Sequence, residues 1–98
     1  MRDGAAAEQL GRNLFMARRR AGYSQEELAT RCLLHRTEIG LVESGRRLPR
    51  ADTLVKLASA LGIGAGELLV GIEWIVPAPG RPGSFVVSPG PPRGGRPR

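Results

Sequence analysis

The sequence contains few of the side chains on which cross-linking, metal binding and acid–base catalysis depend. Its 98 residues include one cysteine, one histidine, one tryptophan, one tyrosine and two phenylalanines. The single cysteine, Cys32, excludes an internal disulfide, and without a cysteine–histidine cluster we expect no metal site. Its place on the apolar side of a predicted helix favours a small core residue over a reactive thiol. With one histidine, His35, and no paired carboxylates in a plausible cleft, acid–base chemistry has no residues to use, and we expect neither an enzyme nor a cofactor.

Long apolar runs are also missing. No segment approaches the roughly eighteen consecutive apolar residues that a membrane-spanning helix needs. The first residues, MRDGAAAEQLGRN, lack the long apolar core of a secretion signal. The sequence therefore predicts a cytoplasmic protein without a membrane partner.

Acidic residues are absent from the last part of the chain. Residues 1–76 hold eleven basic and nine acidic side chains, whereas residues 77–98 hold four arginines and no acid, which together give the net charge of +6. Residues 77–98 also contain seven of the eight prolines and only one apolar triplet. Such a segment cannot bury enough apolar surface to offset its ordering entropy, so we predict a disordered basic tail over 77–98. This tail either attracts DNA without sequence preference or is inert.

Apolar residues at helical spacing predict a single all-α domain over residues 8–76, preceded by a flexible N-terminus at 1–7. The predicted helices cover about residues 8–20, 24–32, 35–44, 50–61 and 65–70. Ser24 and Glu27 have the capping-box spacing at the start of the second helix. The segment IEWIV after the fifth helix fits a helix extension, a short strand or a cover for the core. Trp74, within this segment, fits either a lid on the core or a dimer contact.

Two short helices separated by a tight turn are typical of the bihelical unit that reads DNA. The second helix of such a unit enters the major groove, and its N-terminal end makes the closest approach. The predicted helix over 35–44 is apolar on one side and presents Arg36, Thr37 and Leu41 on the other. Arg36 is the best candidate for reading a base, because a guanidinium can bridge O6 and N7 of guanine. The alternatives are a phosphate contact or a solvated charge.

Two other residues of this helix have more than one interpretation. Gly40 costs about 1 kcal/mol of helix propensity relative to alanine. That cost fits either a close approach to DNA or drift at an exposed site. Glu38 would repel phosphate, so it should either turn away from DNA or accept a hydrogen bond from cytosine N4.

Three segments resemble a known family when they are taken in their order and spacing: GYSQEELATRC, IGLVESGRRLPRADTLVKLASALGI and GELL. They are similar to the phage Cro/repressor-type helix-turn-helix family, also called XRE-like, over about Leu10 to Val70. This resemblance implies a bundle of five α-helices that binds double-stranded DNA, usually as a homodimer, and regulates transcription.

The resemblance also implies roles for individual residues. Four residues would line the face that enters the major groove: His35, Arg36, Thr37 and Leu41. Four others would contact phosphates: Ser24, Gln25, Arg46 and Arg47. Gln25 would also steady a neighbouring base-reading side chain, and Arg18 with Glu43 matches a charged pair that ties the first helix to the third.

The sequence departs from the family pattern at two positions. Leu33 stands where the turn usually carries glycine, at a position that commonly needs positive φ and would cost a leucine about 1–2 kcal/mol. His35 stands where the family usually caps the third helix with serine or threonine. A histidine caps poorly, so we expect its imidazole to face the DNA instead.

Two functional hypotheses follow. The first is a sequence-specific transcriptional regulator, a dimeric repressor on a pseudo-palindrome with half-sites about 34 Å apart. A narrower form of it is an antitoxin or restriction–modification controller that acts on its own operon. The second is a protein-interaction module on the same fold, which Arg36, Arg46 and Arg47 disfavour and which Gly40 and Leu41 leave open.

Overall fold

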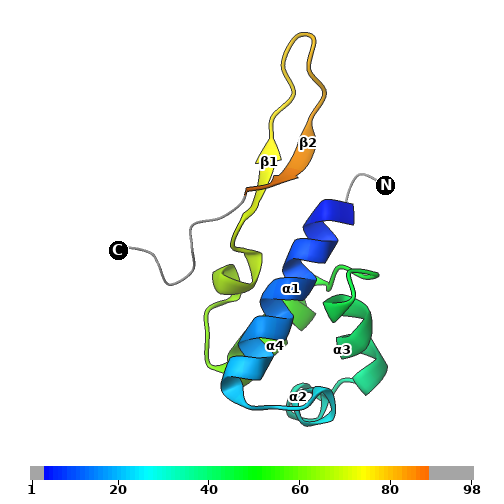
Figure 1. The fold of residues 1–98 in the computed structure, drawn as a ribbon, viewed down its shortest axis with the longest axis vertical. Helices are drawn as coiled ribbons and strands as arrows, with labels where there is room; N and C mark the ends of the chain where they lie inside the picture. The colour runs from blue at the N-terminus through cyan, green and yellow to red at the C-terminus, as the bar shows by residue number, and fades with distance from the viewer. Residues whose placement is uncertain (1–3, 89–98) are drawn as a thin grey trace.

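The computed structural model describes residues 4–88 as a small helical body from which a β-hairpin projects (Figure 1). The elements in chain order are α1 (Gly4–Ala21), α2 (Gln25–Cys32), α3 (Arg36–Glu43), α4 (Ala51–Leu61), the 3-10 helix η1 (Ala65–Leu69), β1 (Ile72–Ile75) and β2 (Ser84–Val87). Between residues 4 and 88, no helix has both the length and the apolar character needed to cross a bilayer.

The core is aliphatic, and every helix contributes to it. Its largest fully buried side chains are Leu14 of α1, Leu28 of α2, Ile39 and Val42 of α3, Leu57 of α4 and Leu68 of η1. Cys32 lies among them, with its Sγ 3.5 Å from the backbone carbonyl of Lys56. Burial raises the pKa of the Cys32 thiol, which disfavours the reactive thiolate. The residue is therefore part of the core, as expected.

Helix α1 crosses α3 at very short range because a glycine stands at the contact. A Cβ atom built on Gly11 would lie 2.5 Å from the carbonyl oxygens of both Val42 and Glu43. Any side chain at Gly11 would therefore push the two helices apart. This close crossing brings the middle of α1 against the end of α3, at Val42 and Glu43.

Two helix predictions need correction. The N-terminus predicted to be flexible over 1–7 is helical from Gly4 onward, and residues 1–3 lie outside the described residues. Ala6 and Ala7 are buried, so a run of good helix formers also contributes to packing. The predicted fifth α-helix is the 3-10 helix η1, only five residues long. Gly71, with φ 87°, follows it closely and begins the turn into β1.

The predicted disorder over 77–98 is wrong for residues 77–88, which complete a hairpin, and the fold is therefore not purely α-helical. Residues 89–98 lie outside the described part of the chain. Strands β1 and β2 pair antiparallel, and Trp74 faces Phe85 with ring centroids 5.0 Å apart. A Cβ on Gly83 would lie 2.6 Å from the Trp74 ring, so this glycine makes room for the indole. The segment IEWIV thus supplies a strand, and Trp74 packs on the hairpin rather than covering the helical core.

The turn between α2 and α3 contains the unusual backbone conformation that the sequence predicted. Leu33 has φ 56° and ψ 42°, the left-handed conformation that the family's glycine would adopt without strain. Its side chain is 87 % exposed, so burial offsets little of that strain. Nothing in the structure explains a leucine at this position.

Replacing Leu33 with glycine should therefore stabilise the protein. We expect Leu33→Gly to raise the free energy of unfolding by about 1 kcal/mol, because relief of the left-handed strain exceeds the entropy that glycine adds to the unfolded chain. Leu33→Ala is the matched control, since it removes the same exposed side chain but keeps the strain. Urea unfolding followed by circular dichroism measures both. Equal stabilities of the glycine and alanine variants would contradict the strain argument.

Candidate nucleic-acid interface

Helix α3 has one buried side and one open side. Ile39 and Val42 are fully buried, whereas Arg36 and Thr37 at the N-terminal end are exposed. Leu41 is half-buried one turn further along. The structure thus brings the predicted base-reading residues to one accessible surface, with Leu41 the least exposed among them.

His35 caps α3, contrary to the expectation that histidine would leave this position uncapped. Its Nδ1 accepts a hydrogen bond from the backbone N–H of Thr37 at 3.1 Å. This bond satisfies one of the free donors at the start of the helix. An imidazole that accepts at Nδ1 carries its proton on Nε2. The Nε2–H group of His35 is therefore the donor that remains for a ligand.

Arg18 and Glu43 form the buried ion pair that the family resemblance implied. The Nε atom of Arg18 donates to Glu43 at 2.6 Å and Nη2 donates to the other carboxylate oxygen at 3.0 Å, so the pair is bidentate. The two side chains are only 9 % and 6 % exposed. The remaining Nη1 of Arg18 donates to the carbonyl of Tyr23 at 2.9 Å. The hydrogen bonds to Glu43 raise the pKa of the Arg18 guanidinium, which stays charged at any working pH.

Gln25 connects this buried pair to the exposed end of α3. Its Nε2 donates to Glu43 at 3.0 Å, and its Oε1 accepts from Nη1 of Arg36 at 3.0 Å. Ionised Glu43 can only accept hydrogen bonds and Arg36 can only donate them, so the network fixes the orientation of the amide. The result is one chain of hydrogen bonds from the inside of the domain to the tip of α3. It holds Arg36 on the α2 side of that tip.

The first turn of α2 lies beside the same arginine. Ser24 caps α2, since its hydroxyl accepts from the N–H of Glu27 at 3.0 Å. An open hollow of about 400 Å³ lies between this turn and α3, lined by Arg18, Ser24, Gln25, Glu26 and Arg36. The predicted phosphate contacts Ser24 and Gln25 therefore adjoin the predicted base-reading Arg36.

The two arginines after α3 differ in their surroundings. Arg47 forms an ion pair with Glu38, which connects the loop back to the first turn of α3. Glu38 is thereby neutralised at the flank of the helix, and its predicted repulsion of phosphate is reduced. Arg46 is exposed to solvent. Sequence reasoning missed the pairing of Glu38 with Arg47, because its only signal is opposite charge nine residues apart across a helix end.

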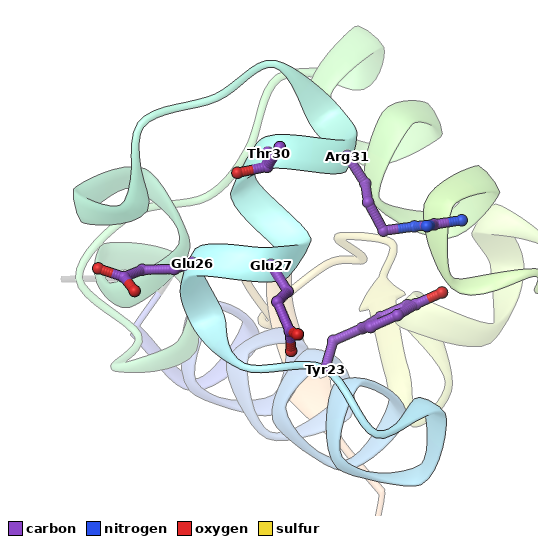
Figure 2. Close-up of a pocket in the computed structure, with 5 residues that line it drawn as sticks. All are labelled: Tyr23, Glu26, Glu27, Thr30 and Arg31. Atoms are coloured by element: carbon purple, nitrogen blue, oxygen red, sulfur yellow. The ribbon is translucent and has the colours of Figure 1, made fainter.

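A second hollow on α2 has a different character (Figure 2). It has a volume of about 350 Å³ and is lined by Tyr23, Glu26, Glu27, Thr30 and Arg31. The guanidinium of Arg31 lies 4.8 Å above the Tyr23 ring, and the two side chains lie side by side in the figure. The two carboxylates in its lining would repel a phosphate backbone. The face of α3 is therefore the better candidate for contact with nucleic acid.

The sequence profile of the helix-turn-helix family matches residues 14–68. This chain belongs to that family. The match confirms the resemblance inferred from the motifs, and it includes every member of the network from Arg18 to Glu43. The hairpin β1–β2 lies beyond the matched residues and is an addition to this helix-turn-helix core.

Individual relatives agree with this assignment. A hypothetical transcription factor from Neisseria meningitidis is 41 % identical over 61 residues, which are 62 % of this chain and 58 % of that protein. Control protein C.BamHI from Bacillus amyloliquefaciens is 42 % identical over 50 residues, which are 51 % of this chain and 62 % of that one. The aligned part thus spans about three fifths of each of these two relatives. The restriction–modification controller protein C.AhdI from Aeromonas hydrophila has a similar fold, with TM-score 0.62 and 39 % identity over 63 % of this chain and 94 % of its own.

The buried ion pair yields a stability prediction. Glu43→Leu should lower the free energy of unfolding by about 3–5 kcal/mol, because it leaves the charge of Arg18 buried without a partner. The double variant Arg18→Met with Glu43→Leu should recover most of this loss, since no unpaired charge remains. Chemical denaturation of both variants provides the measurement. A double variant as unstable as the single one would refute the attribution of the loss to the orphaned charge.

Proposed function

We propose that this protein is a sequence-specific DNA-binding transcriptional regulator that inserts the N-terminal end of α3 into the major groove. Family membership supports this proposal, and so do the transcription factor and the controller proteins among its relatives. The observation that carries it is the placement of Arg36, which is exposed at the tip of α3 and held by Gln25. A base-reading side chain that is already oriented loses less entropy on binding than a free one.

The open face of α3 offers complementary contacts to base edges. Arg36 bridges O6 and N7 of a guanine, and Thr37 reads a neighbouring base through its hydroxyl or its methyl group. Leu41 contacts a thymine methyl one turn further along. The Nε2–H of His35 donates at the edge of the groove. These four residues lie within the first two turns of α3 and its cap, the part of a recognition helix that comes closest to the bases.

Phosphate contacts surround this reading surface. The second hydrogen of the Gln25 amide, which donates to no described residue, and the hydroxyl of Ser24 face the DNA backbone beside the first turn of α2. Arg46 contacts the backbone on the other side of α3. Arg47 lies close to the same DNA strand as Arg46. Because it also neutralises Glu38, Arg47 contributes less to the affinity for DNA than Arg46 does. Because the ligand is chromosomal duplex DNA, the protein acts in the cytoplasm.

The proposal also includes a homodimer that binds two half-sites about one helical turn apart. The projecting hairpin supplies the contact surface. Trp74 exposes 51 % of its surface although it already packs against Phe85, and Val76 beside it is also exposed. A two-stranded hairpin on its own is marginally stable in water, so a partner that covers its aromatic face stabilises it further. Tryptophan is enriched at the centres of such interfaces.

A narrower candidate function is a controller that regulates its own operon. The specific support is the similarity to a control protein and to a restriction–modification controller protein, the second of which aligns over 94 % of its own length. The test is to measure binding to a duplex that covers the region upstream of the protein's own gene. If the protein bound this upstream duplex no more tightly than a random duplex, the controller function would be excluded, whereas a general transcriptional regulator would still fit.

The first functional prediction separates base reading from phosphate binding. The parent protein should bind duplex DNA with log K falling steeply as log salt rises. Arg36→Ala should cost about 1–3 kcal/mol on a duplex selected from a random library and should relax the preference at one base pair. Arg46→Ala, the matched control, should weaken binding to all sequences alike and flatten the salt dependence.

Selection and titration with fluorescently labelled duplexes measure these effects. Weak DNA binding by the parent protein, without salt dependence, would favour the hypothesis of a protein-interaction module. The assignment of roles would fail if Arg36→Ala left the sequence preference unchanged.

The second functional prediction concerns self-association. Trp74→Ala should raise the dimer dissociation constant about tenfold or more, because it removes the central aromatic side chain of the proposed interface. Val55→Ala is the control, since Val55 is another exposed apolar residue but lies on α4. Sedimentation velocity over a concentration series measures both. Dissociation caused by Val55→Ala alone would place the interface on α4 instead of the hairpin.

A further inference from the structure

Among the described residues, two glycines lie in the interior of α-helices, beyond the first turn, where glycine is a poor helix former. Gly11 stands in α1 and Gly40 in the middle of α3. The packing explains Gly11, because a Cβ there would lie 2.5 Å from two backbone carbonyl oxygens of α3. A fold with this helix crossing cannot accept a side chain at Gly11.

The packing does not explain Gly40. Its φ is not positive, so its backbone conformation is open to any residue. Apart from its two chain neighbours and the nearby backbone of its own helix, the only atom within 4 Å of a Cβ built there is Oε1 of Gln25, at 4.0 Å, which is ordinary van der Waals contact. An alanine therefore fits without moving the chain or breaking the hydrogen bond between Gln25 and Arg36. The domain would be more stable with alanine at this position.

The position of Gly40 indicates what its missing side chain leaves room for. It follows Arg36 by one helical turn and so lies on the same side of α3. Gln25 adjoins it on one flank, and Leu41 follows it on the open face. Gly40 is thus central to the proposed DNA-reading surface, and it is the one place on that surface where the helix backbone is bare.

We propose that Gly40 is the point of closest approach between α3 and duplex DNA. Without a side chain here, the backbone of α3 lies directly against the base edges in the major groove, which lets Arg36 reach a guanine with both hydrogen bonds. A methyl group at this point holds the helix away from the groove floor. Hydrogen bonds weaken steeply with added length, so the bidentate contact is lost. This inference rests on the proposed function.

The experiment compares Gly40→Ala with the parent protein and with Gly66→Ala. Gly66 lies in η1, away from α3, and a Cβ there would meet nothing closer than 4 Å, so an alanine fits there as it does at Gly40, which makes it a matched control. Thermal unfolding gives Tm for each. Titration with a duplex selected by the parent and with a random duplex of equal length gives the affinities.

We expect Gly40→Ala to raise Tm by roughly 4–8 °C, the effect of restored helix propensity in a domain of this size. Its affinity for the selected duplex should fall about tenfold, the loss expected for one base contact. Its affinity for the random duplex should fall less, because nonspecific complexes depend on phosphate contacts. Gly66→Ala should leave both affinities unchanged.

The outcomes distinguish this inference from the proposed function. A Gly40→Ala variant that is more stable and binds the selected duplex as well as the parent would overturn the close-approach inference alone. A variant whose Tm does not rise would overturn it too, since the fold would then need the glycine. A parent protein without salt-dependent DNA binding would overturn both the inference and the proposed function.

Discussion

The buried pair of Arg18 and Glu43 determines how the parts of this domain work together. Two charges that are almost fully removed from water are costly unless each is paired and hydrogen-bonded. Here the guanidinium is satisfied by a bidentate carboxylate and by the carbonyl of Tyr23. A small shift of α3 along α1 would leave a charge unpaired. The pair therefore fixes the register of the two helices, in addition to the close crossing that Gly11 permits.

The carboxylate of Glu43 also links the buried ion pair to the surface. Glu43 accepts from Gln25, and Gln25 accepts from Arg36, so the exposed arginine is placed by the interior of the domain. Each bond in the chain joins a donor to an acceptor whose role is fixed, which leaves one arrangement for the network. A small helical domain has few rigid elements that can hold an exposed side chain such as Arg36 in one orientation. The network supplies that rigidity with three hydrogen-bonded links.

Local signals in the sequence determined what could be predicted. Helix starts, apolar stripes and the capping box at Ser24 depend on residues a few positions apart, and they are correct to within a few residues. The strained turn at Leu33 followed from the family pattern, and the structure has the expected positive φ. The pair of Arg18 and Glu43 is 25 residues apart and was reached only through the family resemblance. Periodicity alone gives no information on such contacts.

The predictions that proved wrong, for residues 77–88 and for His35, failed for the same reason. Each depended on a contact that the sequence of the segment alone does not show. The apolar triplet 85–87 lies in a segment dominated by proline, glycine and arginine, and composition averaged over 77–98 predicted disorder. Pairing with β1 gives this triplet the partner that the average could not reveal, and the described prolines of this segment, Pro77, Pro79 and Pro82, fall outside the two strands. His35 was expected to be a poor cap, but a ring nitrogen that accepts from Thr37 performs the same task as a hydroxyl. Both errors come from judging a residue or a segment by its composition alone, without the contact that it makes in the folded chain.

The features that reduce stability are concentrated in the unit formed by α2, the turn and α3. Leu33 keeps a left-handed backbone that glycine would adopt freely, and Gly40 weakens the helix that presents Arg36. Gly11 looks equally unfavourable in sequence, yet its helix crossing requires it. Natural sequences tend to break local rules at functional sites, where stability alone does not decide the residue. A cost that packing explains belongs to the fold, whereas an unexplained cost on the proposed reading face of α3 points to a ligand. By this criterion Gly40, and not Gly11, belongs to the proposed recognition surface.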